Sequence, residues 1–160
     1  MKKLILSLAL ASATLTACQH LPQTTPSIQA AATNTTERNK ANALAFYDLA
    51  FNQHKVKEAS AQYIGKHYLQ HNPTVADGSQ AFIDAFEPFL RQHPQSRATV
   101  KRVIAEGDLV VLHVHSQLDE KDRGEAVVDI FRFDENGKIV EHWDTIQAVP
   151  DKTVSGRSLF

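Results

Sequence analysis

The chain has 160 residues, of which 42% are hydrophobic and 22% charged, so it is long enough and apolar enough to fold as one domain with a core. The formal net charge of −1 provides no basic surface for nucleic acid. The single cysteine excludes an intrachain disulfide and a zinc site built on cysteines.

The N-terminus has the organisation of a signal peptide. Two lysines follow Met1, and the apolar run from Leu4 to Leu10 is too short to span a bilayer. The segment ends Leu-Thr-Ala-Cys18, which resembles a bacterial lipobox. That resemblance implies removal of residues 1–17, lipidation of Cys18, and a lipid anchor on the cell envelope facing the periplasm. Gln19 in place of aspartate favours the outer membrane. The alternative is an ordinary secretory signal with a coincidental cysteine.

Residues 18–35 are rich in Thr, Pro, Gln and Ala, a composition typical of a disordered tether. The predicted domain covers residues 36–149 and begins with Thr36 as the N-cap of a helix. The apolar face of this helix consists of Ala43, Phe46, Tyr47, Ala50 and Phe51, which we expect to belong mainly to the core. A short second helix is predicted over residues 55–62.

A short strand or extended arm is predicted from Tyr63 to Pro73, because Pro73 disfavours a helical conformation at Asn72. A third, strongly amphipathic helix begins at Ser79 and contains Pro88, which should kink it. Its apolar stripe is predicted as core and consists of Phe82, Ile83, Phe86, Phe89 and Leu90.

From Ser96 onward the period of the apolar residues changes from helical to two. Strands are predicted over residues 97–106, 109–118, 124–133 and 139–148, followed by a tail over residues 150–160. Asn136-Gly137 is typical of a hairpin turn. Helices followed by strands indicate an α+β fold, with N-terminal helices packed on a curved, mainly antiparallel sheet around an internal pocket.

Asp129 is a carboxylate in the middle of the apolar run from Glu125 to Phe133. Side chains alternate across a strand, so Val127, Asp129 and Phe131 share one face. Both faces are apolar near the middle, which predicts a strand covered on both sides. An unpaired buried carboxylate is costly, so Asp129 should be paired or functional.

His113 and His115 are two residues apart and therefore point the same way. If the strands on either side of the loop form a hairpin centred on residues 121–122, the residue numbers of two opposed positions add up to about 243. This register places both histidines next to Asp129. A histidine beside a carboxylate is suited to proton transfer, although a buried structural ion pair is an equal alternative. On the last strand His142 and Asp144 share one face and Trp143 the other, and which of them lines the pocket is left open.

His113 and His115 on one strand are also a possible zinc pair, with a third ligand from His71, His142 or Asp129. The chain has no H-E-x-x-H motif. We therefore predict no metal site.

Five segments together resemble the SnoaL-like polyketide cyclase family over about residues 37–149. These segments are Y-L-Q-H-N-P from Tyr68, A-E-G-D-L-V from Ala105, H-V-H-S from His113, D-I-F-R-F from Asp129 and G-K-I-V-E-H-W-D from Gly137. The resemblance implies a cone-shaped fold of the nuclear-transport-factor and ketosteroid-isomerase type, often dimeric through the sheet. It also implies ring closure by aldol condensation without metal or cofactor.

The resemblance implies roles for individual residues. Asp129 would be the catalytic acid/base, and His115, together with Asn72 or Tyr68, would polarise the substrate carbonyl. The predicted substrate-binding residues are Asn72, His113, Tyr68, His71, Phe131 and Trp143.

The sequence thus predicts an exported enzyme that acts on a small carbonyl compound by acid/base chemistry such as enolisation, aldol reaction or isomerisation. The predicted partners are a small-molecule ligand, a membrane reached through the lipid anchor, and a second copy in a homodimer. The alternative is a non-catalytic envelope lipoprotein that binds a small apolar ligand or a protein partner.

Overall fold

The computed structural model describes residues 26–160. The predicted signal peptide, Cys18 and the tether up to residue 25 lie outside this range. The helices are α1 (Pro26–Tyr47), the π-helical segment η1 (Asp48–Asn52), α2 (Val56–Tyr63) and α3 (Ser79–Gln92). The strands are β1 (Ile64–Gln70), β2 (Arg97–Glu106), β3 (Leu109–Gln117), β4 (Glu125–Phe133) and β5 (Ile139–Ala148).

Helix α1 begins earlier than the sequence indicated. Residues 26–35 are helical although they were predicted as part of a disordered tether, and the side chains of residues 30–35 are exposed. The alanines at 30–32 favour a helix even without burial. Thr36 is therefore not an N-cap; its hydroxyl donates to the Ala32 carbonyl one turn earlier. Within residues 26–160 no helix combines the length and the apolar character needed to cross a bilayer.

The predicted strands all form, and the arm before Pro73 adds a fifth. The sheet order is β1-β5-β4-β3-β2, with antiparallel pairs throughout except for β1, which runs parallel to β5. This parallel pairing brings Gln70, at the end of β1, opposite His142 on β5. The α+β class and the mainly antiparallel sheet are thus confirmed.

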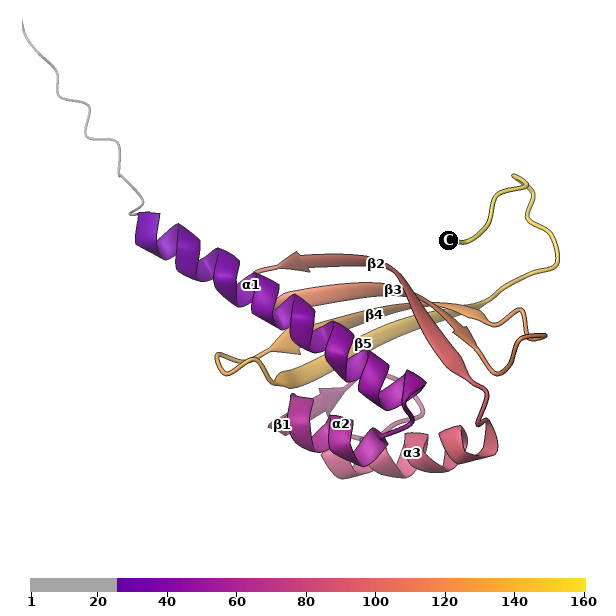
Figure 1. Ribbon diagram of the computed structural model, residues 1–160, viewed down its shortest axis with the longest axis horizontal. Coiled ribbons are helices and arrows are strands. Elements are labelled where there is room, and N and C mark those ends of the chain that lie inside the picture. The colour runs from indigo at the N-terminus through magenta and orange to yellow at the C-terminus, as the bar shows by residue number, and fades with distance from the viewer. Residues whose placement is uncertain (1–25) are drawn as a thin grey trace, which may run out of the picture.

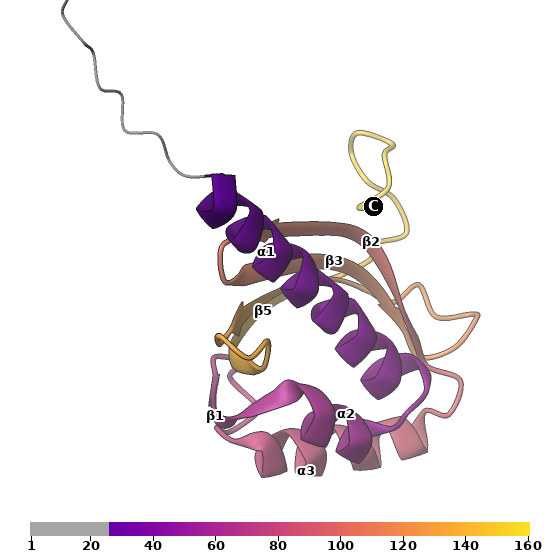
Figure 2. The same ribbon diagram turned by 60° about the vertical axis from the view of Figure 1, so that its left-hand side comes forward.

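The three helices cover one face of the curved sheet (Figures 1 and 2). Helix α1 crosses the concave side and packs on β2 and β3, while α2 and α3 lie together beside β1. Phe46 of α1 occupies the centre of the core, with its ring 5.4 Å from that of Phe82 and 5.9 Å from that of Phe131. The helices therefore enclose the inner face of the sheet.

Strand β4 alternates as predicted, with Val127, Asp129, Phe131 and Phe133 buried on the inner face. The prediction that both faces are covered is wrong, because Val128 on the outer face is 38% exposed. The helices pack on one side of the sheet only, so apolar residues on the outer side stay accessible in the single chain. The last residue, Phe160, folds back to this outer side and packs on the rings of His113 and His115.

Gly124 ends the loop that joins β3 to β4. Its φ is +75°, and a Cβ there would lie 2.0 Å from the Ser116 carbonyl oxygen. Gly107 provides a matched control, because its φ is +59° but nothing lies within 4 Å of a Cβ. Gly107→Ala should cost about 1–2 kcal/mol of unfolding free energy for the left-handed backbone, and Gly124→Ala about 1–3 kcal/mol more for the clash. Urea denaturation measures both, and equal losses would contradict the steric role of Gly124.

Candidate functional site

A cavity of about 500 Å³ lies between the helices and the inner face of the sheet. Aromatic rings from α1, η1 and α3 form one wall, and polar groups from β1, β4 and β5 gather on the other. The lining includes Tyr47, Phe51, Tyr68, Gln70, Asn72, Phe82, Phe86, Phe89, Asp129, Phe131, His142 and Asp144. The Phe stripe of α3, predicted as core, thus also forms the cavity wall.

Asp129 is only 5% exposed and both of its carboxylate oxygens are occupied. His142 Nε2 lies 2.9 Å from Oδ1, and the Tyr47 hydroxyl donates to Oδ2 over 2.9 Å. The cross-strand register explains the contact, because Phe131 pairs with His142 and Asp129 pairs with Asp144. All four side chains therefore point inward. Asp129 is paired, as a buried carboxylate should be.

The protonation of this pair follows from its neighbour Gln70. Gln70 Oε1 accepts the Asn72 backbone N–H over 3.0 Å, which fixes the orientation of its amide. His142 Nδ1, 2.8 Å from the same oxygen, must then be the donor. The remaining proton lies between His142 Nε2 and Asp129 Oδ1. The pair is therefore neutral overall, either as imidazolium and carboxylate or as imidazole and carboxylic acid.

Tyr68 presents a hydrogen-bond donor to the cavity. Its hydroxyl accepts from Gln70 Nε2 over 3.1 Å, and its own proton has no acceptor within residues 26–160. Burial, followed by the charge of Asp129, raises the pKa of Tyr68 well above its usual value. The hydroxyl is thus protonated over the whole physiological range. Burial and Asp129 likewise raise the pKa of Tyr47.

Asp144 differs from Asp129 in having an unoccupied oxygen. Asn72 Oδ1 accepts the Thr74 backbone N–H, so its Nδ2 is the donor to Asp144 Oδ2, at 2.6 Å. Within the described residues Oδ1 of Asp144 has no hydrogen-bond partner. Asp144 is half-buried and lines the cavity. It therefore presents a carboxylate oxygen ready to accept a proton.

Four of the predicted site residues, Asp129, Tyr68, Asn72 and Phe131, lie in the cavity. The other four, His113, His115, His71 and Trp143, do not, and the predicted contact between His115 and Asp129 is wrong. His115 pairs with Ala126 and His113 with Val128, so the predicted register was in error by about two residues. Such a shift preserves alternation, and residues 126, 128 and 130 all point away from Asp129.

The outer face holds these four residues in other contacts. Arg102 donates to His113 Nδ1, and His115 Nε2 donates to the Arg123 carbonyl. The His71 and Trp143 rings stack at 4.9 Å with a 7° interplanar angle. The open question about β5 is thus answered: His142 and Asp144 face the cavity, and Trp143 faces outward.

Two features could have been read from the sequence. Val110, Leu112 and Val114 are the more apolar side of β3 and are fully buried, so the histidines between them had to face outward. The turn at Asn136-Gly137 places Asp129 near Asp144 in a hairpin. The contacts of Gln70 with His142 and of Tyr47 with Asp129 could not be read in this way, because they join segments that are distant in the chain.

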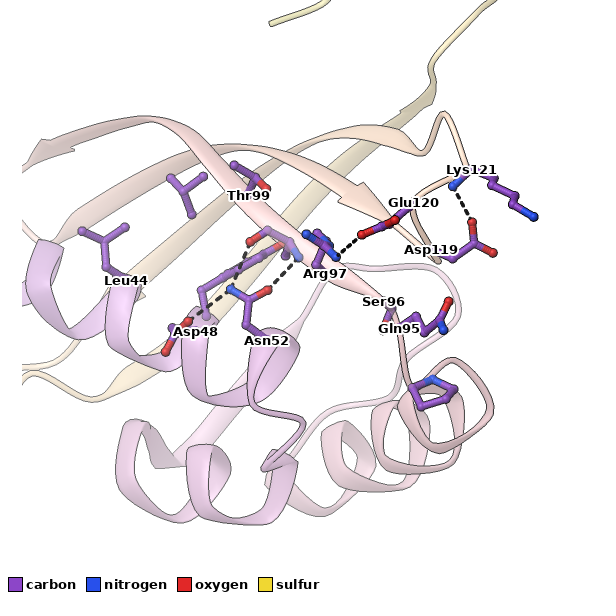
Figure 3. Close-up of a pocket in the computed structure, with 14 residues that line it drawn as sticks. Leu44, Asp48, Asn52, Gln95, Ser96, Arg97, Thr99, Asp119, Glu120 and Lys121 are labelled. Atoms are coloured by element: carbon purple, nitrogen blue, oxygen red, sulfur yellow. Dashed lines mark hydrogen bonds and ion pairs between the residues drawn. The ribbon is translucent and has the colours of Figure 1, made fainter.

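A larger groove of about 1040 Å³ adjoins the cavity (Figure 3). It lies between η1 and the start of β2, where Asn52 bridges to both backbone groups of Ala98. Its polar residues include Arg97, which forms an ion pair with Glu120 at 3.5 Å. Tyr47, Ser96, Arg97 and Ala98 line both hollows. The groove lacks the Asp129–His142 pair, so we place the candidate site in the smaller cavity.

Solved structures with this fold come from several bacteria. An NTF2-like protein of unknown function from Mesorhizobium loti matches with a TM-score of 0.58 at 18% identity, over 71% of this chain and 93% of that one. A candidate polyketide cyclase from Bacillus cereus matches with a TM-score of 0.59 at 18% identity, over 69% and 74%. A candidate isomerase of the SnoaL-like family from Agrobacterium tumefaciens matches with a TM-score of 0.57 at 13% identity, over 72% and 99%.

At these identities the likeness shows the fold alone, an NTF2-like cone. No curated protein matches the chain. The family model of the SnoaL-like domain matches residues 43–142. This range includes the end of α1, the start of β5 and most of the cavity lining. The family predicted from the five sequence segments is thereby confirmed: the chain belongs to the SnoaL-like domain family.

Proposed function

We propose that this protein is a cofactor-independent enzyme that removes a proton from the carbon next to a carbonyl group. The observation that carries this proposal is the presence, in one largely apolar cavity, of a free carboxylate oxygen on Asp144 and an uncommitted hydroxyl proton on Tyr68. Such chemistry needs a base for the carbon acid and a donor for the developing enolate oxygen. The structural neighbours described as candidate cyclases and isomerases agree with it.

In this mechanism Asp144 takes the proton, and the C–H electron pair forms the enolate double bond while charge moves to the carbonyl oxygen. Tyr68 donates to that oxygen. The enolate carbon then attacks a second carbonyl carbon, whose oxygen takes the proton back from Asp144, or it recovers that proton at another carbon. The neutral Asp129–His142 pair holds Gln70, and Gln70 Nε2 holds the Tyr68 hydroxyl. The sequence predicted Asp129 as the base, and that role stays a prediction. Asp144 takes the role in this mechanism because both oxygens of Asp129 are occupied in the free protein.

The experiment that tests the function is mass spectrometry of small molecules released from natively purified protein, followed by incubation of the recovered compound with fresh protein. A carbonyl compound that is converted, or that exchanges its α-hydrogen with D₂O, would support the proposal. A recurrent ligand that is neither converted nor exchanged would contradict it.

Such an unconverted ligand would support the second candidate, a non-catalytic binding protein. The aromatic wall formed by Phe51, Phe82 and Phe86 favours this candidate, because it suits an apolar ligand whatever the polar groups do. In that case Asp144→Asn should leave ligand affinity nearly unchanged.

We further propose that the protein is exported, anchored through lipidated Cys18 to the periplasmic side of the outer membrane, and assembled as a homodimer. The N-terminal sequence supports the first two statements and the exposed apolar outer sheet face supports the third. Labelling with a radioactive fatty acid should be lost in Cys18→Ser. Analytical ultracentrifugation should give twice the monomer mass, and a monomer would contradict the dimer.

Tyr68→Phe should lower turnover by about 10²–10³-fold, the effect of losing one donor to a developing oxyanion. The ring and its packing remain, so the unfolding transition should change little. A matched control is Tyr63→Phe. The Tyr63 hydroxyl accepts from Gln62 at the exposed end of α2 and does not line the cavity. Equal rates in the two variants would show that Tyr68 is not the donor.

A further inference from the structure

Three potential metal ligands meet at the polar wall of the cavity. Asp129, His142 and Asp144 each present one ligand atom, and these atoms lie within 4.8 Å of one another. This group is separate from the His113–His115 pair considered from the sequence, which lies on the outer face of the sheet.

Each of the three side chains has a hydrogen-bond partner that leaves one ligand atom directed at the other two. His142 directs Nδ1–H to Gln70 Oε1, which leaves Nε2 as the coordinating atom. Tyr47 holds the far oxygen of Asp129, and Asn72 holds one oxygen of Asp144. Ligating histidines and carboxylates in metal sites characteristically have such outer hydrogen-bond partners, because these fix the tautomer and the direction of the lone pair.

The charge of the cluster also favours a cation. Metal ligands bind in their deprotonated forms, and two carboxylates with one neutral imidazole balance the charge of a divalent cation. Arg97, which also lines this cavity, forms an ion pair with Glu120.

The distances require only a small adjustment. His142 Nε2 and Asp129 Oδ1 are 2.9 Å apart. Tetrahedral ligands at about 2.1 Å from a zinc ion would be about 3.4 Å apart. The Asp129–His142 pair must therefore open by about 0.5 Å, and a pair at the 4.8 Å limit must close by about 1.4 Å. Asp144 is half-buried and is held only by Asn72 among the described residues, so it can make this movement.

We propose that Asp129, His142 and Asp144 form a binding site for one divalent transition-metal ion of the zinc type. One imidazole with two carboxylates suits a borderline metal, and three protein ligands leave a position open to the cavity. This inference does not depend on the proposed enzymatic function. A bound ion would occupy the Asp144 carboxylate, so it would inhibit the metal-free reaction proposed above.

The test uses the purified full chain, stripped with EDTA and titrated with Zn²⁺ alone by calorimetry. One equivalent should bind, and Co²⁺ in its place should give the visible absorption of a nitrogen- and oxygen-ligated ion. His142→Ala should abolish this binding. Gln70→Ala should weaken it by about 10–100-fold, as expected for the loss of an outer hydrogen-bond partner. No binding above buffer, or unchanged binding in His142→Ala, would overturn the proposal.

The matched control is the double variant His113→Ala and His115→Ala, which removes two histidines from the opposite face and should bind Zn²⁺ like the wild type. Loss of binding there would place the metal on the outer face and reject the cavity site. Asp144→Asn is a second variant in case His142→Ala does not fold, and undiminished binding in it would also overturn the proposal. Turnover is measured in EDTA, where no metal is bound, so its result does not depend on whether the metal titration succeeds. The two proposals are therefore tested separately.

Discussion

Asp144→Asn should lower turnover by about 10²–10⁴-fold, which is the usual contribution of a positioned general base. The asparagine can keep the hydrogen bond with Asn72, because its own side-chain oxygen can accept from Asn72 Nδ2. The shape of the cavity is then preserved while the proton acceptor is lost. The measurement is the rate of conversion, or of α-hydrogen exchange, of the compound recovered from the purified protein.

Asp129→Asn is the matched comparison. An amide at position 129 can accept from Tyr47 and donate to a neutral His142, so the hydrogen bonds of the network survive. We expect this variant to lose far less activity than Asp144→Asn. The opposite ranking, with Asp144→Asn active and Asp129→Asn inactive, would return the role of base to Asp129.

Removing His142 alone should cost about 3–5 kcal/mol of unfolding free energy, because it leaves the buried Asp129 carboxyl group without the hydrogen-bond partner of its Oδ1. The side chains of the two residues are only 10% and 7% exposed. In a double-mutant cycle with His142→Phe and Asp129→Leu, the doubly substituted protein should be more stable than the sum of the two single losses predicts. Urea denaturation at neutral pH provides the four free energies.

The exposed pair of Lys40 and Glu37 on α1 serves as the control for this cycle. Its coupling should be below about 1 kcal/mol, as is usual for surface ion pairs. A coupling between His142 and Asp129 as small as that of the surface pair would mean that the buried proton-sharing pair contributes nothing specific to stability.

Much of the fold could be predicted from local signals. The four main strands follow from the change of apolar period at Ser96, and the turn between the last two follows from Asn136-Gly137. The start of α1 could not, because the side chains of residues 30–35 are exposed and provide no apolar period to reveal the helix. The fifth strand was predicted as a short strand or an extended arm, but its pairing was not predicted, since its parallel partner β5 is some seventy residues further along the chain.

The candidate site was predicted in part, because local features of the sequence were visible and contacts between distant segments were not. Asp129 stood out because a carboxylate in an apolar run is locally unusual, and its alternation with Val127 and Phe131 is a property of any strand. Its partners are not local: Tyr47 comes from α1, and His142 and Asp144 come from the neighbouring strand. Choosing His115 over His142 was an error about which face of β3 the helices cover.

The sequence by itself therefore determined the family, the order of the main helices and strands, and the burial of Asp129, because each of these is expressed in residue types and their period. Only the tertiary structure decided that His142 and Asp144, and not His113 and His115, share the cavity with Asp129. Alternation along a strand shows which residues share a face, but it does not show which face is enclosed. That depends on where α1, α2 and α3 pack on the curved sheet.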